Sequence, residues 1–306
     1  MFSAPAIGQQ PAPTPKHPGN VEKFLKGVYS ETNQEFTFRT DYPGGFQRWQ
    51  AEARTRLQKL VGLDNISKHC ASHKPIVELS KPEDRKEYTI RKGRIETEPN
   101  VQIPFWMLRP KGDGPFPLAV LPHGHDLDGH DTYAGIYRDD ARRTKSLAKD
   151  GDVAVQAVKR GFVAIAPAIR GLATAAGGVP DVFNRHGNRD CRSHFMHCLL
   201  AGRTAVGERV WDMSRVIDWA AKLPDVSAEN ILMMGNSGGG VVTMYAAAVD
   251  DRITIAVPSC SFSGIRGSVV VQAGFTTATA APYPAFYAGE NFTMCVASSR
   301  RVTCWQ

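Results

Sequence analysis

Three kinds of segment are missing from this 306-residue chain, and each absence argues against a class of protein. No run reaches the ~18 consecutive apolar residues of a membrane-spanning helix. The first 20 residues lack the basic start and long apolar run of a secretory signal peptide. The six cysteines include no CxxC pair and no dense framework, which argues against a chain held together by disulfides. We therefore predict free thiols, no membrane partner and a cytoplasmic location.

The chain also lacks a clustered basic surface. It has 37 Lys and Arg against 30 Asp and Glu, a net charge of +7, and both signs are interspersed, as over residues 138–150. Proteins that bind nucleic acid usually gather basic residues in a stripe with aromatic residues between them. We therefore predict an ordinary solvated surface and no nucleic-acid partner.

Composition divides the chain into four segments. Residues 1–20 are rich in proline, which predicts disorder. Residues 21–84 are predicted to form an N-terminal helical extension, with an amphipathic helix over 46–63. Residues 85–267 are the predicted core. Residues 268–306 carry three charged side chains and no clear periodicity, so this tail is predicted to diverge from the core pattern.

Short apolar runs alternate with helical patterns through the core. Two partly alternating strands are predicted at 88–95 and 101–109, and nearly continuous apolar strands follow at 117–122, 162–169, 231–235 and 253–258. Helices are predicted at 152–161, 202–224 and 239–249. Strands that are apolar on both faces are typical of a parallel sheet with helices on either side. The sequence predicts a doubly wound, mostly parallel α/β sheet.

The motif Gly235-Asn236-Ser237-Gly238-Gly239 stands between a predicted strand and a predicted helix. In this context G-x-S-x-G forms a sharp turn that exposes the serine hydroxyl above the sheet. Gly235 and Gly239 are needed for close approach of the backbone, so we predict Ser237 as a catalytic nucleophile. A phosphate-binding turn is the alternative, but the segment lacks the lysine of a P-loop.

A second loop, His123-Gly124-His125-Asp126, follows the predicted strand at 117–122. A serine hydrolase needs two donors for its oxyanion, and we predict the backbone N–H groups of Gly238 and of the residue near His125. The histidines and aspartates of residues 123–131 resemble a metal-binding motif, but Leu127 interrupts it. We therefore predict no metal and no cofactor here. His194, His197 and Cys198 are predicted to pack or to line a pocket wall.

These segments, with GRTAVGERVWDMSRVIDWAAKLPDVSAENI (202–231), resemble bacterial α/β hydrolases of the acetyl xylan esterase and dienelactone hydrolase-like group. The resemblance covers residues 85–267. It implies an α/β-hydrolase fold and a serine hydrolase that cleaves carboxylic esters, including acetyl esters of small molecules or carbohydrates, through an acyl-enzyme on Ser237.

The last third of the chain contains no histidine, whereas the α/β-hydrolase triad follows the order Ser, acid, His. The acids after Ser237 are Asp250, Asp251 and Glu290. We therefore expect an atypical or truncated C-terminus without the last strand–helix units, and a loss of the family pattern near Gly267. By this pattern the catalytic triad of the chain is incomplete. The alternatives are a non-catalytic remnant, and a peptidase or thioesterase on the same fold.

Overall fold

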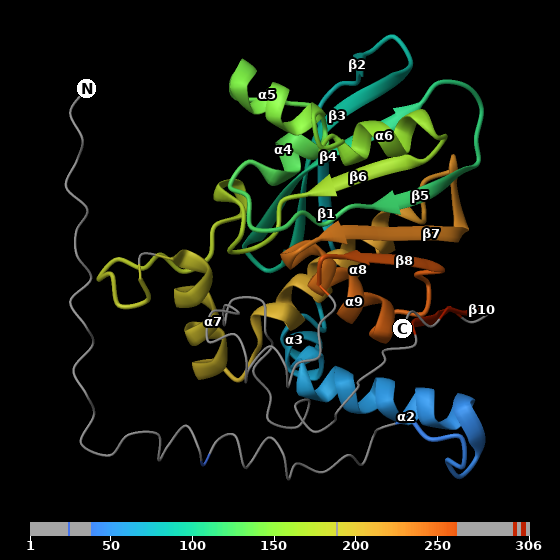
Figure 1. Ribbon diagram of the computed structural model, residues 1–306, viewed down its shortest axis with the longest axis vertical. Helices are drawn as coiled ribbons and strands as arrows, with labels where there is room; N and C mark the ends of the chain where they lie inside the picture. The colour runs from blue at the N-terminus through green and yellow to red at the C-terminus, as the bar shows by residue number, and fades with distance from the viewer. Residues whose placement is uncertain (1–23, 25–37, 188, 262–295, 299–300, 304–306) are drawn as a thin grey trace.

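A computed structural model of the protein describes residues 38–187, residues 189–261, the single residue 24 and two short segments at 296–298 and 301–303 (Figure 1). Its helices are α2 (Gly45–Leu60), α3 (Leu63–His69), α4 (Gly129–Tyr133), α5 (Asp140–Leu147), α6 (Val153–Lys159), α7 (Asp190–Leu200), α8 (Ala205–Ala220) and α9 (Gly238–Val249). Its strands are β1 (Ile76–Leu79), β2 (Glu83–Asp84), β3 (Tyr88–Glu98), β4 (Val101–Pro110), β5 (Phe116–Val120), β6 (Val163–Pro167), β7 (Val226–Asn236), β8 (Ile255–Ser259), β9 (Val296–Ser298) and β10 (Arg301–Thr303).

Strands β1 to β8 form one eight-stranded mixed sheet in the order β1-β3-β4-β6-β5-β7-β8, with β2 paired to β3. The pairs from β1 to β6 along this order are antiparallel, whereas β6, β5, β7 and β8 are parallel to one another. The predicted α/β class is confirmed. The sheet contains more antiparallel pairs than we expected of a mostly parallel sheet.

Alternate residues of the central strands enter two separate cores, one on each face of the sheet. In β5, Leu118 and Val120 face the core beneath α8 and α9, and Ala119 faces the core beneath α6. This alternation explains the continuous apolar runs in the sequence, because a strand covered on both faces has no solvent-facing side. Figure 1 shows α4, α5 and α6 on one face, and α8, α9 and the N-terminal helices on the other.

The segment at 21–84, predicted as helical, contains both helix and strand. The amphipathic helix predicted at 46–63 is α2, which contacts α9. The segment also contains β1, which begins at Ile76, and β2. Both strands pair with β3 and so add to that side of the sheet. The predicted disordered N-terminus and most of the predicted tail lie outside the described residues.

Thr204 is the N-cap residue of helix α8. The Thr204 hydroxyl accepts the Gly207 N–H at 2.8 Å and donates to the Val61 carbonyl at 2.7 Å. The first contact caps the helix, and the second fixes α8 against the turn between α2 and α3. Long-range contacts of this kind position α8, whose inner face carries much of the core.

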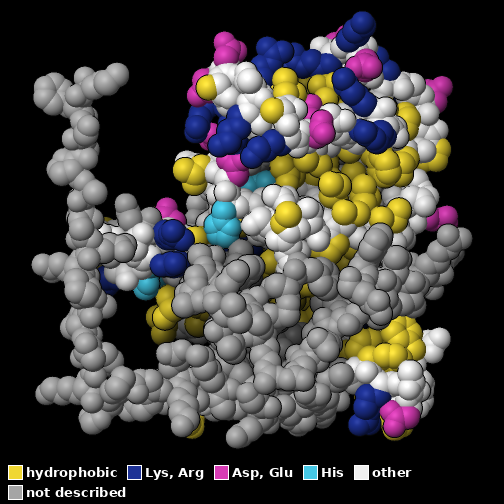
Figure 2. Space-filling model, in the orientation of Figure 1, with side chains coloured by type: hydrophobic (Ala, Val, Ile, Leu, Met, Phe, Trp, Pro, Cys, Tyr) yellow, Lys and Arg dark blue, Asp and Glu magenta, His cyan; other side chains and the backbone are white. Residues whose placement is uncertain are grey.

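Within the described residues, no helix has the length and apolar composition needed to cross a membrane. Figure 2 shows Lys and Arg side chains over the end of the molecule formed by α4, α5 and α6, with acidic side chains among them. The two signs are mixed on this surface, as the sequence predicts.

Candidate active site

Four loops meet at the carboxyl edge of the parallel strands. Strand β5 runs into the loop at 121–128, β6 into the loop at 168–176, β7 into the turn at Ser237 and β8 into Cys260. In open α/β sheets this edge is where ligands bind. The loops touch one another there, so residues far apart in the sequence form one surface.

Ser237 lies between the last residue of β7 and the first residue of α9, so the strand–turn–helix context of its motif is confirmed. Its backbone has φ 54° and ψ −117°, a conformation that residues other than glycine rarely adopt. Two contacts hold this conformation: Ser237 N–H donates to the Ser259 carbonyl at 2.8 Å, and its own carbonyl accepts from Val241 N–H. Strained residues held by their surroundings are frequent at active sites.

The glycines on either side of Ser237 allow the loops to approach it. A Cβ on Gly239 would overlap the Pro122 carbonyl, and a Cβ on Gly235 would overlap both that carbonyl and the backbone of Gly239. Any side chain at these positions would push the turn away from the loop at 121–128. The predicted need for glycine at 235 and 239 therefore has a direct steric cause.

The loop after β5 lies directly against the turn. A Cβ on Gly124 would be 3.2 Å from Ser237 Cβ and 3.5 Å from Gly238 N. The imidazole of His125 is partly exposed, and its Nδ1 would be 3.3 Å from a Cβ on Gly238. The two predicted oxyanion residues, Gly238 and His125, are therefore neighbours. As the first residue of α9, Gly238 also has an N–H that the helix itself does not pair.

His123 fixes this loop and is not available for chemistry. Its Nε2 accepts Ile169 N–H at 3.0 Å, so its Nδ1 carries the proton and donates to the Gly124 carbonyl at 2.8 Å. Burial lowers its pKa to about 4, which keeps the ring neutral. Behind it, the Tyr133 ring packs edge-on, and the Tyr133 hydroxyl contacts the backbone of Asn236. Burial raises the pKa of Tyr133 to about 12.

A buried charge cluster lies behind the loop after β6. Arg170 contacts Glu98 at 2.8 Å, Glu208 at 3.1 Å and Asp212 at 2.5 Å. Arg203 contacts Glu98 at 2.6 Å and Glu208 at 3.0 Å. These five residues, with His194 and Thr97, are called the charge cluster below. Asp212 of α8 is therefore both buried and paired.

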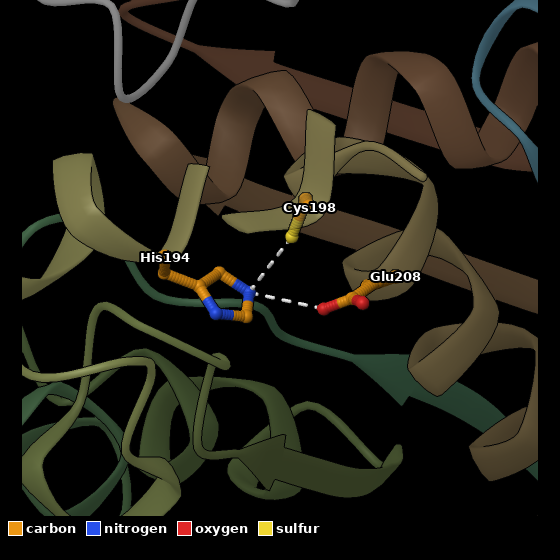
Figure 3. A group of neighbouring side chains, drawn as sticks. All are labelled: His194, Cys198 and Glu208. Atoms are coloured by element: carbon orange, nitrogen blue, oxygen red, sulfur yellow. Dashed lines mark hydrogen bonds and ion pairs between the residues drawn. The ribbon is translucent and has the colours of Figure 1, made fainter. Parts of the chain in front are cut away.

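His194, Cys198 and Glu208 are close enough to suggest a metal site (Figure 3). His194 Nε2 is 3.0 Å from Glu208 and 3.6 Å from Cys198 Sγ, so one nitrogen faces both groups. Burial, followed by the charge of Glu208, raises the pKa of the Cys198 thiol to about 12, which disfavours a thiolate ligand. Because Glu208 already pairs with Arg170 and Arg203, the arrangement fits an ion-pair network better than a cation site.

Of the three candidate acids after Ser237, Asp250 is engaged elsewhere, Asp251 is exposed next to it beyond the end of α9, and Glu290 is not described. Asp250 accepts from Arg252 at 2.6 Å and from Ser214 at 2.9 Å, at the end of α9 farthest from Ser237. Although burial opposes it, the hydrogen bond from Arg252 lowers the pKa of Asp250. Glu290 lies outside the described residues. The structure therefore brings together Ser237, Gly238 and His125, without an acid from the described part of the chain after α9.

Residues 100–294, about two thirds of the chain, match the model of the X-Pro dipeptidyl-peptidase (S15) family. This match includes the loops at 121–128 and 168–176 and the Ser237 turn. The chain belongs to the S15 family. Its fold is that of an α/β hydrolase, and it is related to acetyl xylan esterases.

Curated relatives of this S15 protein are distant hydrolases. It is 26% identical over 219 residues to YtaP of Bacillus subtilis (strain 168), a protein named as a hydrolase, and covers 64% of that protein. It is 24% identical over 234 residues to the acetyl esterase Axe7A of Xylanibacter ruminicola, covering 45% of it. In each case the match takes in 69% of this chain. The chain therefore spans about half to two thirds of the length of these relatives.

A solved Bacteroides fragilis structure, named for acetyl xylan esterase activity, superposes on this S15 chain with a TM-score of 0.62. The identity is 19%, and the match covers 76% of this chain and 58% of the other. It confirms the fold. The S15 match continues to residue 294, beyond Gly267, where the sequence suggested that the family pattern ends. The match therefore gives no support for a truncation there, and residues 262–295 lie outside the described part of the chain.

Several residues that shape this S15 site were not predicted from the sequence. Leu172 approaches Gly238, with its Cδ1 2.9 Å from where a Cβ would stand, and the Ser259 carbonyl holds the Ser237 N–H. Tyr133 supports Asn236 from below. None of these residues stands in a motif. The only available signal was their position at the end of a strand of the parallel half, as for Ser259, or in the loop or helix that follows one.

Proposed function

We propose that the protein hydrolyses carboxylic esters, including acetyl esters of small molecules or carbohydrates, through an acyl-enzyme on Ser237. The observation that carries this proposal is the positive φ of Ser237 at the end of β7, with Gly124 and Gly238 against it. Distant relationship to an acetyl esterase supports an ester substrate.

In this mechanism, Ser237 Oγ attacks the ester carbonyl, and the carbonyl oxygen becomes an oxyanion. The Gly238 N–H at the start of α9 stabilises that charge, helped by the positive end of the helix dipole. A second amide from the loop at His125 completes the pair. The alcohol then leaves, and water releases the acid from Ser237.

The test is covalent labelling with a fluorophosphonate probe, read by intact mass and peptide mapping. We expect one label, on Ser237, and none on Ser237→Ala at the same folded fraction. Release of acetate from 4-nitrophenyl acetate and from acetylated xylan should depend on Ser237 as well. A folded wild-type protein that takes no label would refute the proposal and favour a non-catalytic remnant.

A peptidase is the second candidate, because the matching family is described as an X-Pro dipeptidyl-peptidase. An amide would use the same serine and oxyanion donors but needs a proton for its amine leaving group. Parallel assays with X-Pro-4-nitroanilides and 4-nitrophenyl acetate separate the two. We expect turnover of the ester, and anilide turnover above ester turnover would favour the peptidase.

A further inference from the structure

A cavity of about 650 Å³ lies between α5, the start of α6 and the start of β3. Its lining residues lie outside the four loops of the candidate active site. They include two tyrosines, Tyr88 and Tyr137, and the apolar side chains of Leu147 and Val155. Cavities of about 300–1,000 Å³ that combine apolar walls with a few polar groups are typical of small-molecule sites.

The carboxylate of Asp152, the N-cap residue of α6, also lines this cavity. Asp152 is 7% exposed. One of its oxygens accepts Gln156 Nε2 at 3.1 Å, and its side chain makes no capping hydrogen bond. The ion pairs of the described residues include none with Asp152. A buried carboxylate without a counterion carries a desolvation cost that a positively charged ligand group would offset.

Arg143 of α5 lines the same cavity, and within the described part of the chain it also forms no ion pair. Arg143 and Asp152 therefore do not neutralise each other. Of the other two carboxylates that line the cavity, Asp139 accepts Arg142 N–H at 2.6 Å and caps α5, and Asp140 is exposed. A ligand that satisfies both Asp152 and Arg143 must carry a positive group and a negative group.

The charge of Asp152 acts on both tyrosines of the cavity. Burial is the largest cause that raises the pKa of Tyr88 and of Tyr137, and the charge of Asp152 adds to it in each case. Both hydroxyls are therefore protonated at neutral pH and can donate or accept hydrogen bonds. Their rings offer rigid apolar area to the body of a ligand.

We propose that this cavity binds the zwitterion of an amino acid or a short peptide, with its ammonium at Asp152 and its carboxylate at Arg143. The apolar side chain of the ligand contacts Leu147, Val155 and the tyrosine rings. The ammonium supplies the counterion that Asp152 lacks, and the carboxylate forms a charge-assisted pair with the guanidinium. This site goes beyond the proposed function and does not depend on it.

The experiment is isothermal titration calorimetry of the full chain with the dipeptide Ala-Phe, its N-acetyl form and its C-terminal amide. Hydrogen bonds to charged groups are worth roughly 10- to 100-fold in affinity, so we expect each modification to weaken binding by about that factor. Phenylalanine, titrated in parallel, separates the two sources of the zwitterion. Equal or tighter binding of phenylalanine assigns the cavity to free amino acids, and tighter binding of Ala-Phe assigns it to peptides.

Two variants assign the two ends of the ligand. Asp152→Asn keeps the shape of the side chain and an acceptor for Gln156, so the cavity should stay intact. In this variant N-acetylation should have no further effect on affinity. In Arg143→Gln, amidation should have no further effect. Asp113→Asn is the matched control, because Asp113 is exposed and lies outside the cavity, and it should bind as the wild type does.

Ser237→Ala separates this cavity from the candidate active site. We expect it to bind Ala-Phe with the wild-type affinity, whether or not the wild-type serine takes the fluorophosphonate label. Loss of binding in folded Ser237→Ala would place the ligand at Ser237 and overturn the inference. An affinity that neither N-acetylation nor Asp152→Asn changes would also overturn it. So would the absence of binding at millimolar concentrations, or binding of methyl β-xyloside without binding of Ala-Phe.

Discussion

Replacing Arg170 by Met should destabilise the protein strongly, because this side chain neutralises the charge cluster. Arg170 is 6% exposed and contacts Glu98, Glu208 and Asp212 at 2.5–3.1 Å. Methionine has a similar length and keeps much of the packing volume. The substitution therefore removes the positive charge without leaving a large cavity.

The size of the destabilisation depends on which carboxylates keep a partner after Arg170 is replaced. Glu98 and Glu208 keep their contacts with Arg203, whereas Asp212, 1% exposed, retains the Thr97 hydroxyl at 2.6 Å. One buried carboxylate thus loses its counterion. Breaking a buried pair from one side costs about 3–5 kcal/mol. The free energy of unfolding of a typical domain is about 5–15 kcal/mol, so this loss is a large share of the stability.

Urea unfolding followed by circular dichroism measures this loss. With a slope of about 3 kcal/mol per molar urea, the midpoint should fall by about 1–2 M. Arg203→Met is the control, since Glu98 and Glu208 then keep Arg170, and its loss should be smaller. A loss below about 1 kcal/mol for Arg170→Met would refute the reasoning, because it would mean that water already solvates Asp212.

Three further predictions concern pH and backbone approach. Although burial opposes it, the hydrogen bond from His194 and the charge of Arg170 lower the pKa of Glu208 in the folded protein to about 2, so its stabilisation is full above pH 4.5 and is lost between pH 4.5 and 2. In thermal melts, the melting temperature of Glu208→Gln should depend less on pH between 4.5 and 2 than that of the wild type. The folded pKa of His123 is about 4, so stability of about 3 kcal/mol is lost between pH 6.5 and 4, and His123→Gln should remove this window. Gly239→Ala should cost about 1–3 kcal/mol and abolish labelling, while Gly177→Ala, with open space around it, should change neither.

Periodicity and motif context were enough to predict the central fold. Continuous apolar runs identified the strands of the parallel half, and the turn between β3 and β4, at Pro99 and Asn100, falls between the strands predicted at 88–95 and 101–109. The strands predicted at 88–95, 101–109, 117–122, 162–169 and 231–235 correspond to β3, β4, β5, β6 and β7, so the Ser237 turn follows the fifth of them. Local signals of this kind come from residues close together in the sequence, which is why one sequence can reveal them.

The charge cluster and the small elements were not predictable in the same way. Helices α4, α5 and α7 are short, and α7 has little separation of polar and apolar faces, because Phe195 and Cys198 pack beside buried His194. The partners of Arg170 come from β3 and α8, 72, 38 and 42 residues away in the sequence. No spacing rule relates such residues, so only the folded chain brings them together.

The loop after β6 connects the charge cluster to the candidate site. At one end Arg170 is fixed by three carboxylates, and its carbonyl accepts from Arg209 at 2.9 Å. On either side of it, Ile169 N–H holds His123, and Leu172 packs at Gly238. The rigid cluster therefore sets the position of the backbone that supports both the His125 loop and the Ser237 turn. The buried charges, which cost desolvation energy, thereby hold the loops of a proposed catalytic site in register.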